Sequence, residues 1–184
     1  MIISLSGVQG SGKTTTLNLL KEQPIFEGYK YVTEIMRTLK SEGFKINEAG
    51  DGETQLAVVS MHLSNLLYAH QTNVVVDRGL LDVFAYTRYA YEEKKISESI
   101  YLLVKKLFEL HAPRYDQIFL FEPHGRPLEN DGVRSMDMEW HDRIDSYFHE
   151  AASTLPNVTI LGKGTADDRV ETIVEWLIDH GSSV

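Results

Sequence analysis

The fold is decided by the stretch Gly7-Val8-Gln9-Gly10-Ser11-Gly12-Lys13-Thr14, which matches the phosphate-binding pattern G-x-x-x-x-G-K-[ST]. Residues 2–6, which precede it, are predicted to form a short buried strand, and residues 15–20, which follow it, to form the opening of a helix. A strand, a glycine loop and a helix in this order make a site for a polyphosphate. The sequence therefore predicts that the chain binds a nucleoside triphosphate.

Each residue type in this loop has a physical role. Glycines let the backbone wrap closely enough for its N–H groups to point at phosphate oxygens, and the helix N-terminus adds partial positive charge. Lys13 is expected to reach the β- and γ-phosphates, and the hydroxyl of Thr14 to bind Mg²⁺. The alternative is a chance match in a turn, against which the flanking strand and helix argue. The predicted nucleotide-binding residues are Gly7, Gln9, Gly10, Ser11, Gly12, Lys13, Thr14 and Thr15.

The composition fits one domain spanning residues 1–184, with no cysteine for disulfides or thiolate metal sites. No apolar run has the length of a membrane span, and a strand that begins at residue 2 leaves no room for a signal peptide, so a cytoplasmic location is expected. The formal net charge of -9 argues against non-specific grip on nucleic acid, although a local basic cleft stays compatible with it. His62 and His70 show no metal-ligand spacing and are expected to be surface or packing residues.

Strand and helix patterns alternate along the whole chain, which predicts an α/β fold with a parallel sheet covered by helices on both faces. Ligands of such sheets bind beyond the carboxyl ends of the strands. Strands are expected at 2–6, 29–33, 73–77, 116–121 and 157–161, and helices at about 34–39, 53–71, 80–92, 97–111, 140–151 and 165–180.

Two acids are expected at strand ends. Asp77 ends an apolar run and can hold Mg²⁺ directly or through water, and the adjacent Arg78 suits phosphate or transition-state charge. Glu34 ends the second strand, with Arg37 one turn later, and can accept a proton from a substrate hydroxyl. The alternatives are a strand-capping Asp77 beside a solvated Arg78, and a Glu34 that is only an acid favoured by the helix dipole.

A polar segment at about 122–137 is expected to be a lid. It contains the turn Asn130-Asp131-Gly132, flanked by Arg126 and Arg134, whose guanidinium groups can steady the transferring phosphoryl group. The alternative is a solvated loop.

Two further patterns are weaker. Residues 162–165 lie where an adenine would pack against backbone, although an ordinary turn with Thr165 as a helix N-cap fits equally well. Asp82, Tyr86 and Tyr89 share one helix face and can line a substrate pocket, although aromatic stripes at this spacing are more often core.

Together these residues resemble the small P-loop kinases of nucleosides and nucleotides, over essentially the whole chain. More narrowly, the chain resembles the AAA-type ATPase/kinase-like family that includes the nicotinamide riboside kinase domains of bacterial NAD regulators. The resemblance implies a P-loop three-layer sandwich with strand order 2-3-1-4-5, ATP and Mg²⁺ at Lys13 and Thr14, the metal or acceptor hydroxyl at Asp77, and a lid at Arg134. It rests on residues 7–14, Glu34 with Arg37, Asp77-Arg78-Gly79 with Asp82, and Asp131-Gly132-Val133-Arg134-Ser135 with Asp137.

The sequence thus predicts an ATP-dependent kinase that transfers the γ-phosphate to a hydroxyl or phosphate of a nucleoside or nucleotide. The alternatives are a polynucleotide kinase, including one that acts on a modified base in DNA, and a nucleotide-binding switch or regulatory ATPase. The expected partners are ATP and the acceptor, without a membrane, and a homodimer stays open. The residues expected to be catalytic are Lys13, Glu34, Asp77, Arg78, Arg126 and Arg134.

Overall fold

The computed structural model describes residues 1–68, 72–123 and 137–181, which contain a five-stranded sheet. Its strand order is β2-β3-β1-β4-β5, and every neighbouring pair is parallel, as the sequence predicts. The strands are β1 (Ile2–Ser6), β2 (Lys30–Val32), β3 (Val74–Asp77), β4 (Gln117–Phe121) and β5 (Val158–Leu161).

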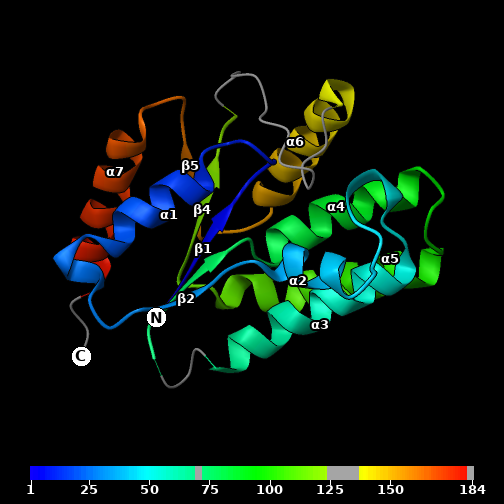
Figure 1. The fold of residues 1–184 in the computed structure, drawn as a ribbon, viewed down its shortest axis with the longest axis horizontal. Helices are drawn as coiled ribbons and strands as arrows, with labels where there is room; N and C mark the ends of the chain where they lie inside the picture. The colour runs from blue at the N-terminus through cyan, green and yellow to red at the C-terminus, as the bar shows by residue number, and fades with distance from the viewer. Residues whose placement is uncertain (69–71, 124–136, 182–184) are drawn as a thin grey trace.

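Helices cover both faces of this sheet and complete a three-layer sandwich (Figure 1). Helices α1 and α7 lie on one face, and α2 to α6 lie on the other. None of the helices in the described ranges is long and apolar enough to cross a membrane. The helices are α1 (Lys13–Lys21), α2 (Ile35–Ser41), α3 (Gly52–Tyr68), α4 (Leu80–Glu92), α5 (Glu98–His111), α6 (Met138–Ala152) and α7 (Ala166–His180), with short 3₁₀ turns at Pro24–Phe26, Asn47–Ala49 and Ala112–Arg114.

Alternate residues of the central strands enter two separate cores. In β4, Phe119 and Phe121 pack toward α1 and α7, while Ile118 and Leu120 pack toward α4 and α6. A strand buried on both faces needs apolar side chains at consecutive positions, which is why these strands read as unbroken apolar runs.

Helix starts are set by side-chain caps. Ser97, Asp137 and Thr165 each accept a hydrogen bond from the backbone N–H of the third residue of the helix that follows. Thr165 also forms a capping box with Asp168. The N-cap alternative for Thr165 is therefore confirmed, and the expected starts at residues 97 and 165 move by one residue.

Small residues let the turn between β3 and α4 lie directly against β1. A Cβ atom on Gly79 would come within 2.4 Å of the Ser4 Oγ atom, so this position needs glycine. The hydroxyl of Tyr115 accepts a hydrogen bond from the Leu80 N–H at 3.3 Å and anchors the same turn. Arg78 and Asp82 consequently lie beside the loop that follows β1.

Candidate functional site

The phosphate loop has the backbone that its glycines predict. Gly7, Gly10 and Gly12 have φ angles of 138°, 76° and 91°, a region that L side chains rarely enter. A Cβ atom on Gly7 would also lie 2.7 Å from the carbonyl oxygen of Phe121 in β4. The loop therefore wraps tightly over the carboxyl end of the sheet, between β1 and α1.

Lys13 lies across this loop and is only 5% exposed. Its Nζ atom donates to the carbonyl oxygens of Gly7 and Val8 at 2.7 and 2.9 Å and contacts the Ser11 Oγ atom at 3.1 Å. The ammonium group thus lies at the inner rim of the loop, within reach of a phosphate that enters it.

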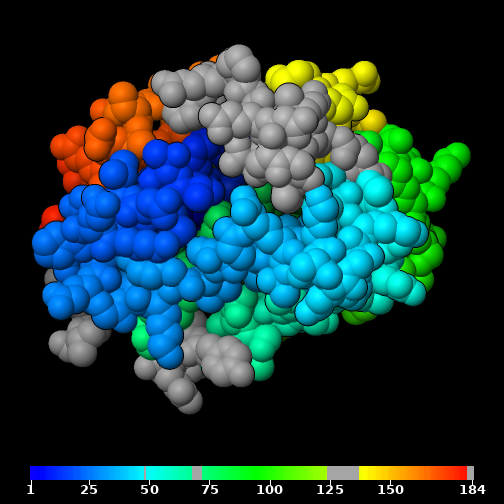
Figure 2. All heavy atoms as spheres, viewed as in Figure 1, coloured from blue at the N-terminus to red at the C-terminus, as the bar shows by residue number. Residues whose placement is uncertain are grey.

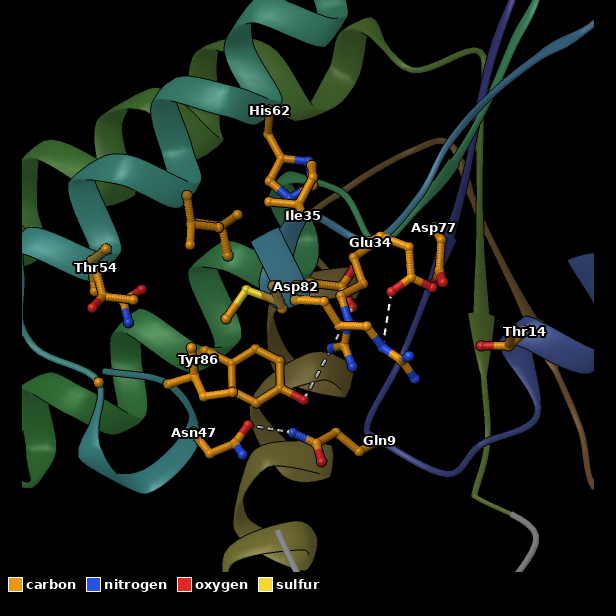
Figure 3. A pocket seen from close by; sticks show the side chains of 18 residues that line it. Gln9, Thr14, Glu34, Ile35, Asn47, Thr54, His62, Asp77, Asp82 and Tyr86 are labelled. Carbon is orange, nitrogen blue, oxygen red and sulfur yellow. Dashed lines mark hydrogen bonds and ion pairs between the residues drawn. The ribbon is translucent and has the colours of Figure 1, made fainter. Parts of the chain in front are cut away.

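A cavity of about 160 Å³ opens beside the phosphate loop (Figure 3). Its walls come from the phosphate loop, the start of α2, the segment 46–50, α3, the end of β3 and the first half of α4. In the space-filling view, α2 and the segment after it (light blue to cyan) lie beside the dark-blue N-terminal region (Figure 2). The sequence predicts neither the segment 46–50 nor α3 as part of a site.

Three of the cavity residues have left-handed backbones without being glycine. The φ angles are 67° for Glu34, 55° for Asn47 and 75° for Arg78, and all three side chains line the cavity. Lys94 is the fourth such residue in the described ranges. Conformations of this kind cost of order 1–3 kcal/mol and concentrate at functional sites, so the clustering marks this cavity.

Glu34 lies one residue before α2, and β2 ends earlier than predicted, at Val32. Its Oε2 atom is 2.8 Å from Nε of Arg37, and about half of its side chain is exposed. Within the described structure the carboxylate pairs with Arg37 and does not cap the helix. The carboxylate therefore lies at the cavity mouth, although the helix-dipole alternative remains compatible with its place.

Asp82 joins the phosphate loop to the β3–α4 turn. It is 2% exposed and accepts hydrogen bonds from the N–H groups of Gly79 at 2.9 Å and Gly7 at 3.3 Å. Burial raises the pKa of Asp82, and the charges of Arg78 and Lys13 oppose that rise. Asp82 follows Gly79 by three residues at the start of a helix, and this spacing is the sequence signal for a carboxylate that accepts from the Gly79 N–H. The interpretation of Asp82 as part of a helix face with Tyr86 and Tyr89 does not reveal this bond.

Arg78 lies between two groups of α4. Its Nη1 atom is 3.8 Å from Oδ1 of Asp82 and donates to the Tyr86 hydroxyl at 3.3 Å. Burial lowers the pKa of Arg78, but Tyr86, Asp82 and Asp77 outweigh it and raise that pKa above its ordinary value. A permanently charged, partly buried guanidinium therefore faces the cavity.

Asp77 and Thr14 supply oxygen atoms at the phosphate side of the cavity (Figure 3). The Asp77 Oδ1 atom is buried and has no hydrogen-bond partner among the described residues. An orphaned carboxylate oxygen beside a hydroxyl suits Mg²⁺, which prefers oxygen ligands and keeps phosphate and water ligands around it. Among the described residues, no group of three His, Asp or Glu side chains could hold a metal ion. An ion at Asp77 and Thr14 would therefore also need ligands from phosphate and water.

The α3 side of the cavity is lined by neutral polar groups. Gln55 accepts a hydrogen bond from the Thr87 hydroxyl at 2.7 Å, which fixes its carboxamide. Gln9 donates to the Asn47 side chain at 2.6 Å and ties the phosphate loop to the segment 46–50. Tyr86 lines the cavity, whereas Tyr89 packs edge-on against Trp140 in the core, which is the core alternative given for this helix face.

His62 is the buried histidine of the cavity wall, which fits the packing alternative of its sequence interpretation. It is a 2% exposed residue of α3, not a surface residue, and it lines the cavity as well as packing. Its Nδ1 atom is buried without a hydrogen-bond partner in the described structure. Burial, aided by the charge of Arg78, lowers the pKa of His62 to about 4. The ring is therefore a neutral hydrogen-bonding group at physiological pH.

This burial predicts a pH dependence of folding stability. The pKa of His62 is about 4 in the folded chain, against 6.5 for a free histidine, so below pH 6.5 the unfolded state binds a proton that the folded state does not. Stability is therefore unaffected above pH 7 and falls with pH, by about 2 kcal/mol between pH 7 and pH 5 from this group. Urea unfolding of wild type and His62→Gln at both pH values measures the difference.

The exposed His180 at the end of α7 provides the control. His180→Gln should keep the wild-type loss of stability, and His62→Gln should lose about 2 kcal/mol less than wild type. Equal pH slopes in all three proteins would contradict a neutral, buried His62.

Several predicted residues lie outside the described residues. These are Arg126, Arg134 and the Asn130-Asp131-Gly132 turn of the expected lid, and His70. Asp137, at the end of that segment, is the N-cap of α6 and accepts from the Trp140 N–H at 3.1 Å.

The parallel sheet and the phosphate loop together define a P-loop nucleotide-binding protein. A family described as AAA domain matches residues 2–169, and the chain therefore belongs to this family. No curated protein sequence matches the chain.

Solved structures show the same fold. Deoxyadenosine kinase from M. mycoides, with the products dCMP and a flexible dCDP bound, superimposes with a TM-score of 0.70 at 14% identity, over 97% of this chain and 100% of that one. The dATP-bound form gives a TM-score of 0.64 at the same identity and coverage. The chain thus has the fold of the P-loop nucleoside and nucleotide kinase superfamily.

Proposed function

We propose that this chain is an ATP-dependent kinase that transfers the γ-phosphate to a hydroxyl of a nucleoside-type acceptor. One observation carries the proposal: a single cavity has phosphate-loop and acidic groups on one side and a recess of neutral polar groups on the other. A nucleotide switch needs loops that sense the nucleotide and has no need of an acceptor pocket. The similarity to deoxyadenosine kinase in fold supports the same class.

The phosphate side would hold the ATP phosphates and Mg²⁺. The loop N–H groups and the Lys13 ammonium would bind the β- and γ-phosphates, and Thr14 and Asp77 would hold the metal. When bound, Mg²⁺ neutralises charge that develops on the phosphate oxygens. Arg78, already oriented by Tyr86 and Asp82, would face the same charge.

Charge favours an acceptor hydroxyl over an acceptor phosphate. Three carboxylates and two guanidinium groups line the cavity, and both guanidinium groups are paired with carboxylates, Arg37 with Glu34 and Arg78 with Asp82. A dianionic nucleoside monophosphate would have to compete for these arginines and would lie near Asp77. A neutral nucleoside meets no such repulsion.

The recess suits a flat ring with hydrogen-bonding edges. Val58, Ile35 and Met36 supply apolar surface, and Tyr86 supplies an aromatic ring. His62 and Gln55 supply neutral polar groups from α3, which can pair with ring nitrogens or exocyclic groups without a charge.

Glu34 is the candidate base at the cavity mouth. As the acceptor oxygen bonds to the γ-phosphorus and the bond to the β–γ bridging oxygen breaks, the hydroxyl proton would pass to Glu34 and ADP would leave. We expect Glu34→Gln to lower kcat on the order of 10²-fold, because a carboxamide cannot accept that proton. ATP affinity, measured by calorimetry, should change less than twofold.

Two variants accompany this measurement. Glu42→Gln changes an exposed acid at the other end of α2 and should behave like wild type. Arg37→Gln breaks the ion pair but leaves the carboxylate, so it should retain more activity than Glu34→Gln. If Glu34→Gln turns over normally, Glu34 is only a helix-start residue.

The assay that tests the function uses γ-labelled ATP with nucleosides, nucleoside monophosphates and single-stranded oligonucleotides, including one with a hydroxymethylated base. Label on a nucleoside hydroxyl supports the proposal. Label on an oligonucleotide supports the polynucleotide kinase, and release of inorganic phosphate without any labelled acceptor supports the regulatory ATPase.

A further inference from the structure

Arg169 is a buried arginine of α7 that connects three segments around the phosphate loop. It is 2% exposed and reaches backward from the first turn of the helix. Its Nη1 atom donates to the carbonyl oxygen of Ser11 at 2.5 Å, and its Nη2 atom donates to that of Glu122 at 2.8 Å. Its Nε and Nη2 atoms both donate to the carbonyl oxygen of Gly162, at 3.1 and 2.8 Å.

The bond to Ser11 acts on the peptide group that the phosphate loop uses. A planar trans peptide points its C=O and N–H in opposite directions. The Ser11 carbonyl and the Gly12 N–H belong to one such peptide, so a donor that holds the carbonyl on the outer side of the loop keeps the N–H directed inward. Phosphate loops bind through inward N–H groups of this kind. Arg169 therefore restricts the loop to the orientation that binds phosphate.

The other two bonds place neighbouring segments relative to this loop. Gly162 follows β5, in the segment 162–165 for which an adenine contact is one of the two interpretations of the sequence, and Glu122 follows β4. The guanidinium carbon Cζ lies over the Phe121 ring, 5.0 Å from the ring centroid, so a cation–π contact also holds the group in place. One side chain thus holds the phosphate loop, the loop after β5 and the end of β4 together.

We propose that Arg169 is a positioning residue for ATP, which keeps the phosphate loop preorganised and in register with the 162–164 loop. The inference rests on the ATP-binding part of the proposed function. The hydrogen bonds of Arg169 go to backbone carbonyl oxygens of three segments, so we expect its effect to reach ATP through the loops that it holds. Loss of such a residue should weaken ATP binding while the acceptor KM stays the same.

The test compares Arg169→Met, Arg169→Lys and Arg88→Met. Arg88 is the matched control because it also bridges elements, from α4 to Glu150 of α6 at 2.5 Å and along α4 to Glu92 at 3.1 Å, and it lies outside the cavity lining. Calorimetry with Mg·ATP and with Mg·tripolyphosphate is done at least 15 degrees below the unfolding midpoint of each variant, with the acceptor KM measured in parallel.

We expect Arg169→Met to bind both ligands roughly tenfold or more weakly than wild type. Each lost hydrogen bond has a charged donor, and the loss of one such bond changes an equilibrium constant by about this factor. Arg169→Lys, which keeps the charge but cannot reach all three carbonyls, should fall between wild type and Arg169→Met. Arg88→Met should lose thermal stability without any change in affinity.

Unchanged affinity for both ligands in folded Arg169→Met would overturn the proposal, as would an equal loss in Arg88→Met. If Arg169→Met does not fold, Arg169→Lys decides the question by the same criteria. ATP binding is measured without an acceptor. If the wild-type protein binds ATP but transfers no phosphoryl group, the proposed kinase activity is contradicted and the role of Arg169 in ATP binding is not.

Discussion

Lys13→Ala should bind ATP on the order of 10²-fold or more weakly than wild type, because each charge-assisted hydrogen bond to phosphate contributes about 1.5–3 kcal/mol. Turnover should fall at least as far, since the ammonium also meets charge on the γ-phosphate in the transition state. The fold should survive, because the hydrogen bonds of the Lys13 ammonium group to Gly7, Val8 and Ser11 stay within the phosphate loop. Calorimetry with Mg·ATP and far-ultraviolet circular dichroism check the two parts.

Lys13→Ala removes more than a positive charge, because it also removes hydrogen bonds that Lys13 makes within the phosphate loop. The ammonium group closes the loop by bonding to the Gly7 and Val8 carbonyls, and phosphate would compete with these carbonyls for its three N–H donors. Alanine removes both the closing bonds and the phosphate contact, so affinity and loop order should decline together.

Lys21→Ala is the matched control for this experiment. Lys21 is an exposed lysine of the same helix and contacts Asn18 at 3.4 Å, away from the loop. It should bind ATP like wild type. Wild-type affinity in Lys13→Ala itself would show that the residues 7–14 do not form a phosphate site.

The fold could be predicted because its strongest signals are local. The apolar run that ends at Asp77 and the glycines of residues 7–14 indicate a buried strand and a tight loop without reference to distant residues. Strand ends were predicted less well because pairing sets them. Only Lys30 to Val32 of the second strand find partners in β3, at Val74 to Val76, and the strand is shorter than its β-branched and aromatic residues suggest.

The site could be predicted only in part. Asp77, Arg78 and Glu34 were expected together because the carboxyl ends of parallel strands meet, and all three line one cavity. His62 and Asn47 were not expected, because a wall made by the packing of a helix and a loop leaves no motif in the sequence. The left-handed backbones of Glu34 and Arg78 also lack a sequence signal, since glycine is the usual residue there.

Asp77→Asn should lower kcat/KM on the order of 10²-fold or more, because the metal that this carboxylate is proposed to hold stabilises transition-state charge by several kcal/mol. The Mg²⁺ concentration that gives half-maximal rate should rise at least tenfold. The side-chain volume is unchanged, so the substitution tests charge and donor type rather than packing. Initial rates across a Mg²⁺ titration, at saturating ATP, give both quantities.

The orphaned oxygen of Asp77 makes this test specific. A buried carboxylate oxygen without a partner in the described structure is available as a metal ligand, and Asp77→Asn removes its charge at almost unchanged size. Asp116→Asn is the control, because Asp116 lies at the opposite end of the sheet and accepts from the Ile2 N–H at 2.6 Å. It should leave the Mg²⁺ titration unchanged. If Asp77→Asn shows the same Mg²⁺ titration as wild type, Asp77 does not hold the metal and is only a strand-capping residue beside Arg78.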